Sequence, residues 1–199
     1  DDPRLEERQE SPRTLIDAAL RIARDSVDNL VDLERLAAFP SEFGRIVERP
    51  STSSRVGVYK DVADAASRVS ALGLLAELAS AYDWEKARLG VMDFADQVAG
   101  ALRIVREHPP VVEELRSRYS VILLDEYQDT SVVQTDLLST LFGGTGVMAV
   151  GDPHQAIYAW RGASAGNLGG FPAAFVPSGG CRTFSLRTSW RNSARVLTA

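Results

Sequence analysis

Two acidic residues, Asp125 and Glu126, end a short apolar run near the middle of the chain. The run, residues 120–124, is typical of a strand buried in a parallel sheet, and open α/β sheets bind ligands at the carboxyl ends of their strands. A nucleotide-hydrolysing site needs one carboxylate to hold Mg²⁺ and another to orient or deprotonate the attacking water. Adjacent strand-end residues point in different directions and can divide these tasks. In the alternative interpretation, the two acids only cap the following helix.

The elements that must position these acids follow from the hydrophobic periodicity. Residues 131–141 predict a helix capped by Ser131, and residues 146–150 predict a second buried strand. A strand, a helix and a strand at this spacing indicate one right-handed crossover unit. The glycine-rich residues 143–146 predict the turn before the second strand. Further on, residues 183–186 predict a third strand and residues 193–199 predict the start of a helix.

The first eighty or so residues are predicted to be all helical. Ser11 can cap a helix that continues through Ala23, and a second helix is expected to stop before Pro40. A shorter helix is predicted before Pro50. A long helix then covers residues 58–82, with a boundary near Gly90 and further helices over residues 92–107 and 111–116.

Three segments resemble motifs of the UvrD/Rep/PcrA helicase family. Residues 125–130, Asp-Glu-Tyr-Gln-Asp-Thr, together with Gln134, resemble motif II, and residues 151–163, Gly-Asp-Pro-His-Gln-Ala-Ile-Tyr-Ala-Trp-Arg-Gly-Ala, resemble motif III. Residues 186–193 are similar to motif IV, although Ser189 and Trp190 replace its Asn and Tyr. Residues 82–94 resemble the return from the family's helical insertion.

The resemblance implies roles at a nucleotide site. Asp125 would hold Mg²⁺, Glu126 would activate water, and Gln155 would touch the γ-phosphate of ATP. Arg191 matches the arginine that stabilises charge during phosphoryl transfer, and Arg187 is the nearby alternative.

The resemblance also implies contacts with single-stranded DNA. Tyr158 and Trp160 match aromatic residues that meet DNA bases, and Arg161 could add a phosphate or stacking contact. The alternative is that Ile157 and Trp160 pack into the core. His154 departs from the acidic residue expected there and is interpreted as a solvent-facing side chain.

The implied fold class is α/β, a partial RecA-like P-loop NTPase parallel sheet preceded by an all-helical subdomain. Residues 1–88 would form the helical insertion, and residues 89–199 the later part of the first RecA-like motor domain. A P-loop needs a lysine after a glycine-rich turn, and neither Lys60 nor Lys86 has that context. The sequence therefore predicts half of an ATP site.

The composition of the 199 residues, 45% hydrophobic and 25% charged, is that of an ordinary folded protein. The net charge of −5 argues against a nucleic-acid binder, unless the basic surface belongs to other domains. No membrane span or secretion signal is visible, so we expect a soluble, cytoplasmic protein with no membrane partner. The single cysteine, Cys181, is expected to be buried.

Together these observations predict a fragment of an ATP-dependent DNA helicase or translocase that moves 3′ to 5′ in DNA repair or recombination. Its cofactors would be ATP and Mg²⁺. Its partners would be single-stranded and duplex-junction DNA and the remaining helicase domains of the parent chain. Two alternatives stay open: the isolated chain is a non-catalytic structural or DNA- or partner-binding module, or the parent is a helicase-nuclease recombination subunit.

Overall fold

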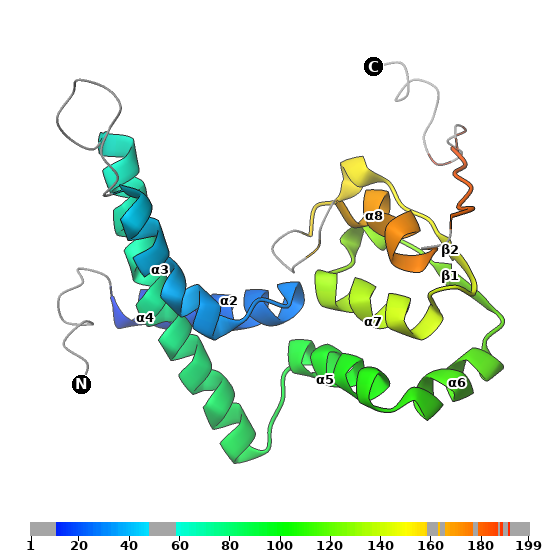
Figure 1. Ribbon diagram of the computed structural model, residues 1–199, viewed down its shortest axis with the longest axis horizontal. Coiled ribbons are helices and arrows are strands. Elements are labelled where there is room, and N and C mark those ends of the chain that lie inside the picture. Colours follow the sequence, from blue (N-terminus) through cyan, green and yellow to red (C-terminus); the bar gives the residue numbers. More distant parts are fainter. Residues whose placement is uncertain are drawn as a thin grey trace.

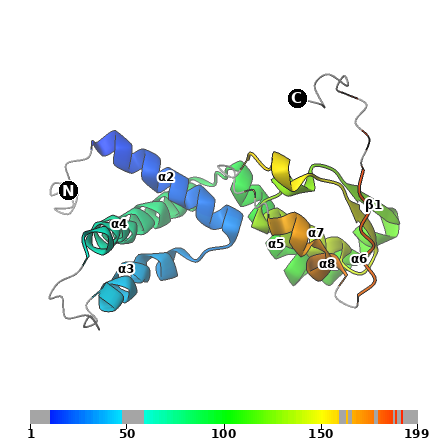
Figure 2. The same cartoon turned by 90° about the horizontal axis from the view of Figure 1, so that it is seen from above.

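The computed structural model describes residues 11–47, 59–158, 163, 166–176, 179–186, 188 and 191. Its elements form two groups, α2 to α4 and then α5 to α8 with the two strands (Figures 1 and 2). Helix α2 links the groups because it contacts α4 on one side and both α5 and α7 on the other. Among the described residues, no helix is both long and apolar enough to span a bilayer.

The first group is built from α2 (Pro12–Asn29), α3 (Leu33–Val47) and α4 (Lys60–Leu89). The predicted cap is confirmed, since the Ser11 side chain accepts a hydrogen bond from Thr14 N and Pro12 opens α2. Helix α3 lies along α4 (Figure 1), which presents the fully buried Ala76 and Ala79. The prediction of an all-helical first part is therefore correct for the described residues.

The expected break at Pro40 is wrong, because α3 continues through this residue to Val47 as one helix. Proline in a helix interior removes a backbone hydrogen bond and costs about 3 kcal/mol. Packing against α4 offsets this cost. At Gly73 of α4, an added Cβ would lie 3.5 Å from the carbonyl oxygen of Ala37 and 3.8 Å from Cγ of Pro40, so the two helices meet closely around the proline.

A sharp turn joins the two groups. Helix α4 ends at Gly90, whose φ of 66° is a left-handed conformation that glycine adopts without strain. Asp93 and Asp96 then form a capping box at the start of α5 (Phe94–Glu107), which α6 (Pro109–Arg118) follows. The long helix thus extends beyond its predicted end at residue 82, up to the turn expected near Gly90.

The second group contains a parallel strand pair. Strand β1 (Val121–Leu124) pairs with β2 (Gly146–Ala149) in register, and α7 (Val132–Phe142) connects them as predicted. Short 3-10 turns, η1 (Tyr127–Asp129) and η2 (Pro153–Gln155), follow the strands, and α8 (Gly166–Phe175) comes last. This small parallel sheet with covering helices is consistent with part of an α/β domain.

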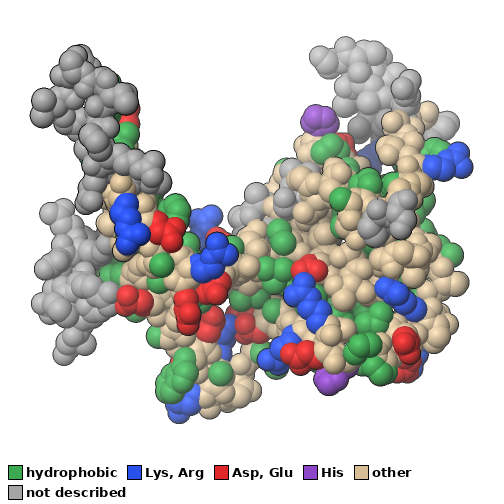
Figure 3. Space-filling view, viewed as in Figure 1, with side chains coloured by type: hydrophobic (Ala, Val, Ile, Leu, Met, Phe, Trp, Pro, Cys, Tyr) green, Lys and Arg blue, Asp and Glu red, His purple; other side chains and the backbone are tan. Residues whose placement is uncertain are grey.

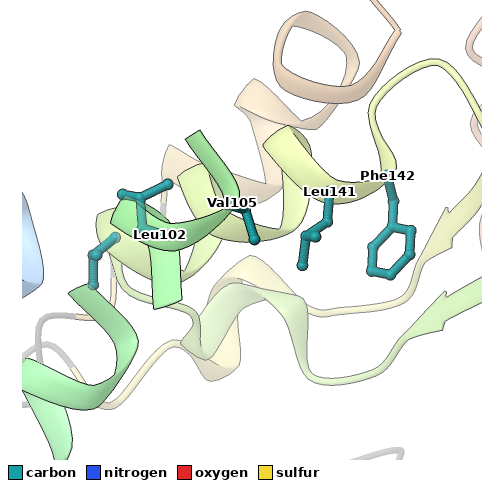
Figure 4. Close-up of a cluster of buried hydrophobic side chains, with 5 residues drawn as sticks. Leu102, Val105, Leu141 and Phe142 are labelled. Carbon is teal, nitrogen blue, oxygen red and sulfur yellow. The ribbon is translucent and has the colours of Figure 1, made fainter. Parts of the chain in front are cut away.

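The core of this group lies on one face of the strands. Leu102 and Val105 of α5 pack with Leu141 and Phe142 of α7 (Figure 4). A second cluster joins Tyr127, Phe171 and Phe175 beside Leu124 and Ala149. Both clusters contact only the side of the sheet that carries Ile122, Leu124, Val147 and Ala149.

The prediction that both strands are buried on two faces is wrong for the described residues. Val121, Leu123 and Met148 point to the other face and are exposed. A parallel strand loses solvent on both sides only when helices cover both sides. The described helices cover one side.

Two further expectations near the end of the chain are also wrong. Residues 183–186 are irregular rather than a third strand, and Phe184 and Leu186 are exposed. An apolar run becomes a strand only when a neighbouring edge accepts its backbone hydrogen bonds. Cys181, expected to be buried, is exposed in the same stretch. The helix predicted for residues 193–199 lies outside the described residues.

Candidate active site

The carboxyl ends of β1 and β2 lie side by side because the strands are parallel and Leu124 pairs with Ala149. Val150 N donates to Leu124 O at 2.8 Å, and Tyr127 N donates to Val150 O at 2.9 Å. These bonds extend the pairing past the last strand residues. The segments that begin at Asp125 and at Gly151 are thereby held at one edge of the sheet.

Asp125 and Glu126 occupy this edge and are both exposed. The backbone N–H of Glu126 donates to Asp125 Oδ1 at 2.9 Å. Glu126 has a φ of 50°, a left-handed conformation that costs a non-glycine residue roughly 1–2 kcal/mol. This turn directs the chain from β1 into η1 and leaves the two carboxylates at the surface.

The turn is anchored by the next residue, Tyr127, which is fully buried. Its ring meets Phe171 edge-on at 5.5 Å between centroids and Phe175 at 6.1 Å, both from α8. Burial raises the pKa of the Tyr127 hydroxyl, although a hydrogen bond to Thr135 opposes the shift. The packing of Tyr127 in this aromatic cluster therefore fixes the turn that carries Asp125 and Glu126.

Gln128 connects the two strand ends and is 1% exposed. Its Nε2 donates to Glu126 Oε2 at 2.7 Å and lies 3.4 Å from Asp129 Oδ2. Its Oε1 accepts a hydrogen bond from Asp152 N at 3.1 Å. The sequence predicted no role for Gln128, because nothing in a glutamine's neighbours along the chain indicates that it will be buried.

The loop after β2 is ordered around Asp152. This carboxylate accepts from Gln155 Nε2 at 2.9 Å and from His154 N at 2.9 Å. These two hydrogen bonds hold the pKa of Asp152 below its usual range, and the bond from Gln155 contributes more. Gln155 is exposed on the same loop, and His154 is exposed as expected.

Beyond η2, the predicted DNA-contacting residues are only partly described. Tyr158 is 38% exposed, and its carbonyl accepts a hydrogen bond from Ala163 N at 3.3 Å. Ile157 is 70% exposed, so the alternative that this residue packs into the core is wrong. Trp160 and Arg161 lie outside the described residues.

The predicted arginine is not joined to the other site residues. Arg191 is exposed, and none of the hydrogen bonds or ion pairs of the described residues connects it to Asp125, Glu126 or Gln155. The alternative, Arg187, lies outside the described residues. Among the described residues, the structure thus links the strand-end residues by hydrogen bonds and shows no such link to the arginine.

The strand-end donor set fits Mg²⁺. This ion is commonly held by one or two carboxylates together with water and substrate phosphates, and Asp125 and Glu126 supply such oxygens at the surface. No group of three or more potential ligands that could hold a metal occurs among the described residues. A magnesium ion here would accordingly depend on phosphate and water for its remaining ligands.

The same part of the chain offers no lysine for a phosphate. Lys86, near the end of α4, is surrounded by carboxylates of α4 and of the start of α5, and Lys60 lies at the start of α4. Acidic and basic side chains are interspersed over the face shown in Figure 3. The described residues are therefore compatible with the magnesium and water side of a nucleotide site, which stays a prediction.

The β1–α7–β2 unit carries two exposed acids at one edge, an arrangement compatible with a nucleotide site. Comparison with known proteins shows which family the chain belongs to. The chain belongs to the UvrD/REP helicase N-terminal domain family, whose pattern matches residues 52–175.

Individual relatives match across the same region. DNA helicase II of Escherichia coli strain K12 is 37% identical over 113 residues, which cover 56% of this chain and 15% of that protein. ATP-dependent DNA helicase UvrD1 of Mycobacterium tuberculosis strain H37Rv is 31% identical over 133 residues, covering 61% of this chain and 17% of that protein. The chain thus spans about one sixth of the length of these relatives.

Proposed function

We propose that the chain is part of the motor of an ATP-dependent DNA helicase or translocase, which couples ATP hydrolysis to 3′ to 5′ movement on single-stranded DNA in repair or recombination. The observation that supports this best is the shared edge of β1 and β2, where hydrogen bonds link Glu126 through Gln128 to Asp152. The names of the relatives, DNA helicase II and ATP-dependent DNA helicase UvrD1, support the same activity.

At this edge we assign a division of labour between the acids. Asp125 holds Mg²⁺, which when bound neutralises phosphate charge, and Glu126 orients the attacking water and accepts its proton. The exposure of both carboxylates supports these roles, because each must be reached by solvent and substrate. We assign Gln155, whose side chain donates to Asp152, to contact with the γ-phosphate. We assign Arg191 to the same phosphate, where its guanidinium would stabilise the charge of phosphoryl transfer.

The loop after η2 is the proposed contact with DNA. Tyr158 is partly exposed, and we assign it, with Trp160 and Arg161, to stacking on and contacting single-stranded DNA. Stacking of one base on an aromatic side chain is worth roughly 1–3 kcal/mol and does not depend on base identity, as translocation requires. Because Gln155 and Tyr158 share one loop, loss of the γ-phosphate would shift the side chain on which a DNA base stacks.

The wider organisation is also part of the proposal. Residues 1–88 would form the helical insertion, and residues 89–199 the later part of a RecA-like motor domain in a cytoplasmic protein. The phosphate-cradling lysine would come from the P-loop part of the same motor domain, and much of the basic DNA-binding surface from the remaining helicase domains. The turn at Gly90, which separates the two groups of elements, supports the division.

A steady-state ATPase assay with and without single-stranded DNA tests the proposal. We expect the full-length protein that contains this sequence to hydrolyse ATP faster when DNA is present, and the 199-residue chain alone to be inactive. Absence of stimulated turnover in the full-length protein contradicts the helicase function. Stimulated turnover by the 199-residue chain contradicts the half-site.

The direction of movement needs a separate measurement. A motor that moves 3′ to 5′ displaces streptavidin from an oligonucleotide biotinylated at its 5′ end much faster than from one biotinylated at its 3′ end. The opposite preference would contradict the proposed polarity while leaving the hydrolysis result intact.

A second candidate is that the isolated chain is a non-catalytic module. The pairing of Lys86 with Asp83, Asp93 and Asp96 favours it, because one of the chain's two lysines is thereby withdrawn from phosphate binding. This candidate concerns only the 199-residue chain and is compatible with a full-length helicase. The ATPase comparison above shows whether the chain alone is catalytic or a non-catalytic module.

A further inference from the structure

One buried amide links the two halves of the candidate active site. Gln128 Nε2 donates to the Glu126 carboxylate at 2.7 Å, while its Oε1 accepts from Asp152 N at 3.1 Å. The Asp152 carboxylate in turn accepts from Gln155 Nε2 at 2.9 Å. An unbroken path of hydrogen bonds therefore runs from Glu126, after β1, to Gln155, after β2.

The chemistry of the linking position is specific. A primary amide has two N–H donors and one carbonyl acceptor on the same planar group, so it can serve a carboxylate and a backbone N–H at once. A carboxylate in its place would offer no donor while ionised, and an aliphatic side chain would offer neither group. At 1% exposure, Gln128 has no water to replace these bonds, and they fix its orientation.

Gly151 leaves the space that this amide occupies. A Cβ at position 151 would clash with Gln128 Oε1 and would lie 3.2 Å from Gln128 N and 3.4 Å from Tyr127 N. A contact below about 3.4 Å is tight, so an alanine would push the flexible end of the glutamine away. The glycine is required here by the close approach of the side chain and not by an unusual backbone conformation.

We propose, on the basis of the hydrolytic function proposed above, that Gln128 is a positioning residue that fixes the Glu126 carboxylate relative to the Gly151–Gln155 loop. Through this link, the residue that activates water and the residue that faces the γ-phosphate move as one unit. Gln128 touches neither substrate nor water. Its contribution is to the rate of hydrolysis and not to nucleotide binding.

The test uses the full-length protein with Gln128→Met, Gly151→Ala, Gln128→Ala and the double variant Gln128→Ala/Gly151→Ala. Methionine fills the space of glutamine without its hydrogen bonds, and the alanine at 151 displaces the amide without removing it. We expect the kcat for DNA-stimulated ATP hydrolysis to fall roughly 10- to 100-fold in each single variant, as for other supporting residues. The Kd for a nucleotide analogue and the melting temperature should change little in Gln128→Met.

The double variant distinguishes the link from two independent defects. Once the glutamine side chain is absent, the alanine at 151 keeps only its backbone contacts, the tighter of them at 3.2 Å from Gln128 N. The double variant should therefore resemble Gln128→Ala in kcat and fall well short of the product of the two single losses. Gly170→Ala in α8, where a Cβ would have no neighbour within 4 Å, is the matched control and should retain wild-type kcat.

Each outcome bears on the proposal. A wild-type kcat in Gln128→Met, or multiplicative losses in the double variant, overturns the positioning role while DNA-stimulated hydrolysis by the wild type keeps the proposed function. Parallel losses of kcat, nucleotide affinity and melting temperature in Gln128→Met would assign the residue to the fold alone and also overturn it. Absence of hydrolysis in the wild type overturns both.

Discussion

Two clusters of acidic residues in this protein have opposite surroundings. At the turn between α4 and α5, Lys86 Nζ lies 3.1 Å from Asp83 Oδ1, 3.2 Å from Asp93 Oδ2 and 2.7 Å from Asp96 Oδ2. The lysine is only 8% exposed and also stacks over the Tyr82 ring. At the β1–β2 edge, Asp125 and Glu126 are exposed, and no lysine or arginine of the described residues pairs with them.

The difference separates acids that hold the fold from acids that are available for chemistry. The ion pairs between a buried cation and the carboxylates around it are costly to break, and they connect the end of one helix to the start of the next. Carboxylates supported by amides and backbone N–H groups are oriented without being neutralised, so they can still bind a cation. The comparison predicts that variants at the first cluster change stability and variants at the second change turnover.

The largest effect is expected for Glu126→Gln in the full-length protein. The loss of the proton acceptor should lower kcat for ATP hydrolysis by roughly 10²- to 10⁴-fold, while nucleotide binding is retained. Single-turnover hydrolysis and nucleotide titration measure the two quantities. Glu113→Gln, on the exposed surface of α6, is the matched control. A parallel loss of nucleotide binding would assign Glu126 to a metal or structural role.

The next effect is expected for Lys86→Met. Removing the cation leaves three neighbouring carboxylates unpaired, which should lower the free energy of unfolding by about 2–3 kcal/mol. This is below the roughly 3–5 kcal/mol typical of a broken buried pair, because the carboxylates are partly solvated. Urea unfolding followed by far-UV circular dichroism measures it. Lys60→Met, the same change at the exposed start of α4, should have little effect. Equal effects of the two variants would show that the cluster does not stabilise the turn.

The stabilisation by Lys86 should also depend on pH. Burial alone would lower the pKa of Lys86, but its interactions with the carboxylates of Asp96, Asp83 and Asp93 outweigh burial and raise the pKa. Burial alone would raise the pKa of Asp93, but hydrogen bonds from Asp96 N and Lys86 lower it.

A lowered carboxyl pKa gives stability that is present above the unfolded value and lost as the pH falls through the folded value, and a raised lysine pKa gives stability lost only at high pH. The stability difference between wild type and Lys86→Met should thus be flat from about pH 5 to pH 9 and shrink below about pH 4. Urea unfolding of both proteins across this range measures it. A difference that grows on acidification would contradict the ion-pair account.

The smallest effect is expected for helix caps in the two groups of elements. Ser131 caps α7 in a reciprocal box with Gln134 and is 2% exposed, whereas Ser11 caps α2 at an exposed position. Ser131→Ala should lower the free energy of unfolding by about 1–2 kcal/mol and Ser11→Ala by about 0.5 kcal/mol. Thermal unfolding of the two variants gives the ranking, and a larger effect at Ser11 would reverse it.

Local features of the fold were predictable from the sequence. The caps at Ser11 and Ser131 were expected from residue type, and each accepts a hydrogen bond from a backbone N–H three residues away. The parallel pairing of two apolar runs around one helix was also expected, because a short crossover permits little else.

Apart from the helix boundaries, the errors involve contacts with distant parts of the chain. The break at Pro40 was expected from local rules, but α4 supports the helix around it. Cys181 and both faces of the strands were expected to be buried, and residues 183–186 were expected to form a third strand. Each expectation depended on neighbouring elements that residue type does not reveal. The resemblance indicated the candidate residues at the strand ends, and their roles stay predictions.

The sequence by itself determined which acids follow the strands, where helices begin, and which family the chain resembles, because these properties depend on residue type and short spacing. Only the tertiary structure decided that Gln128 bonds both to Glu126 and to Asp152, which lies 24 positions further along the chain. It also decided that three carboxylates share Lys86. A hydrogen bond between distant segments forms only after packing has brought them together, and burial then makes its loss costly.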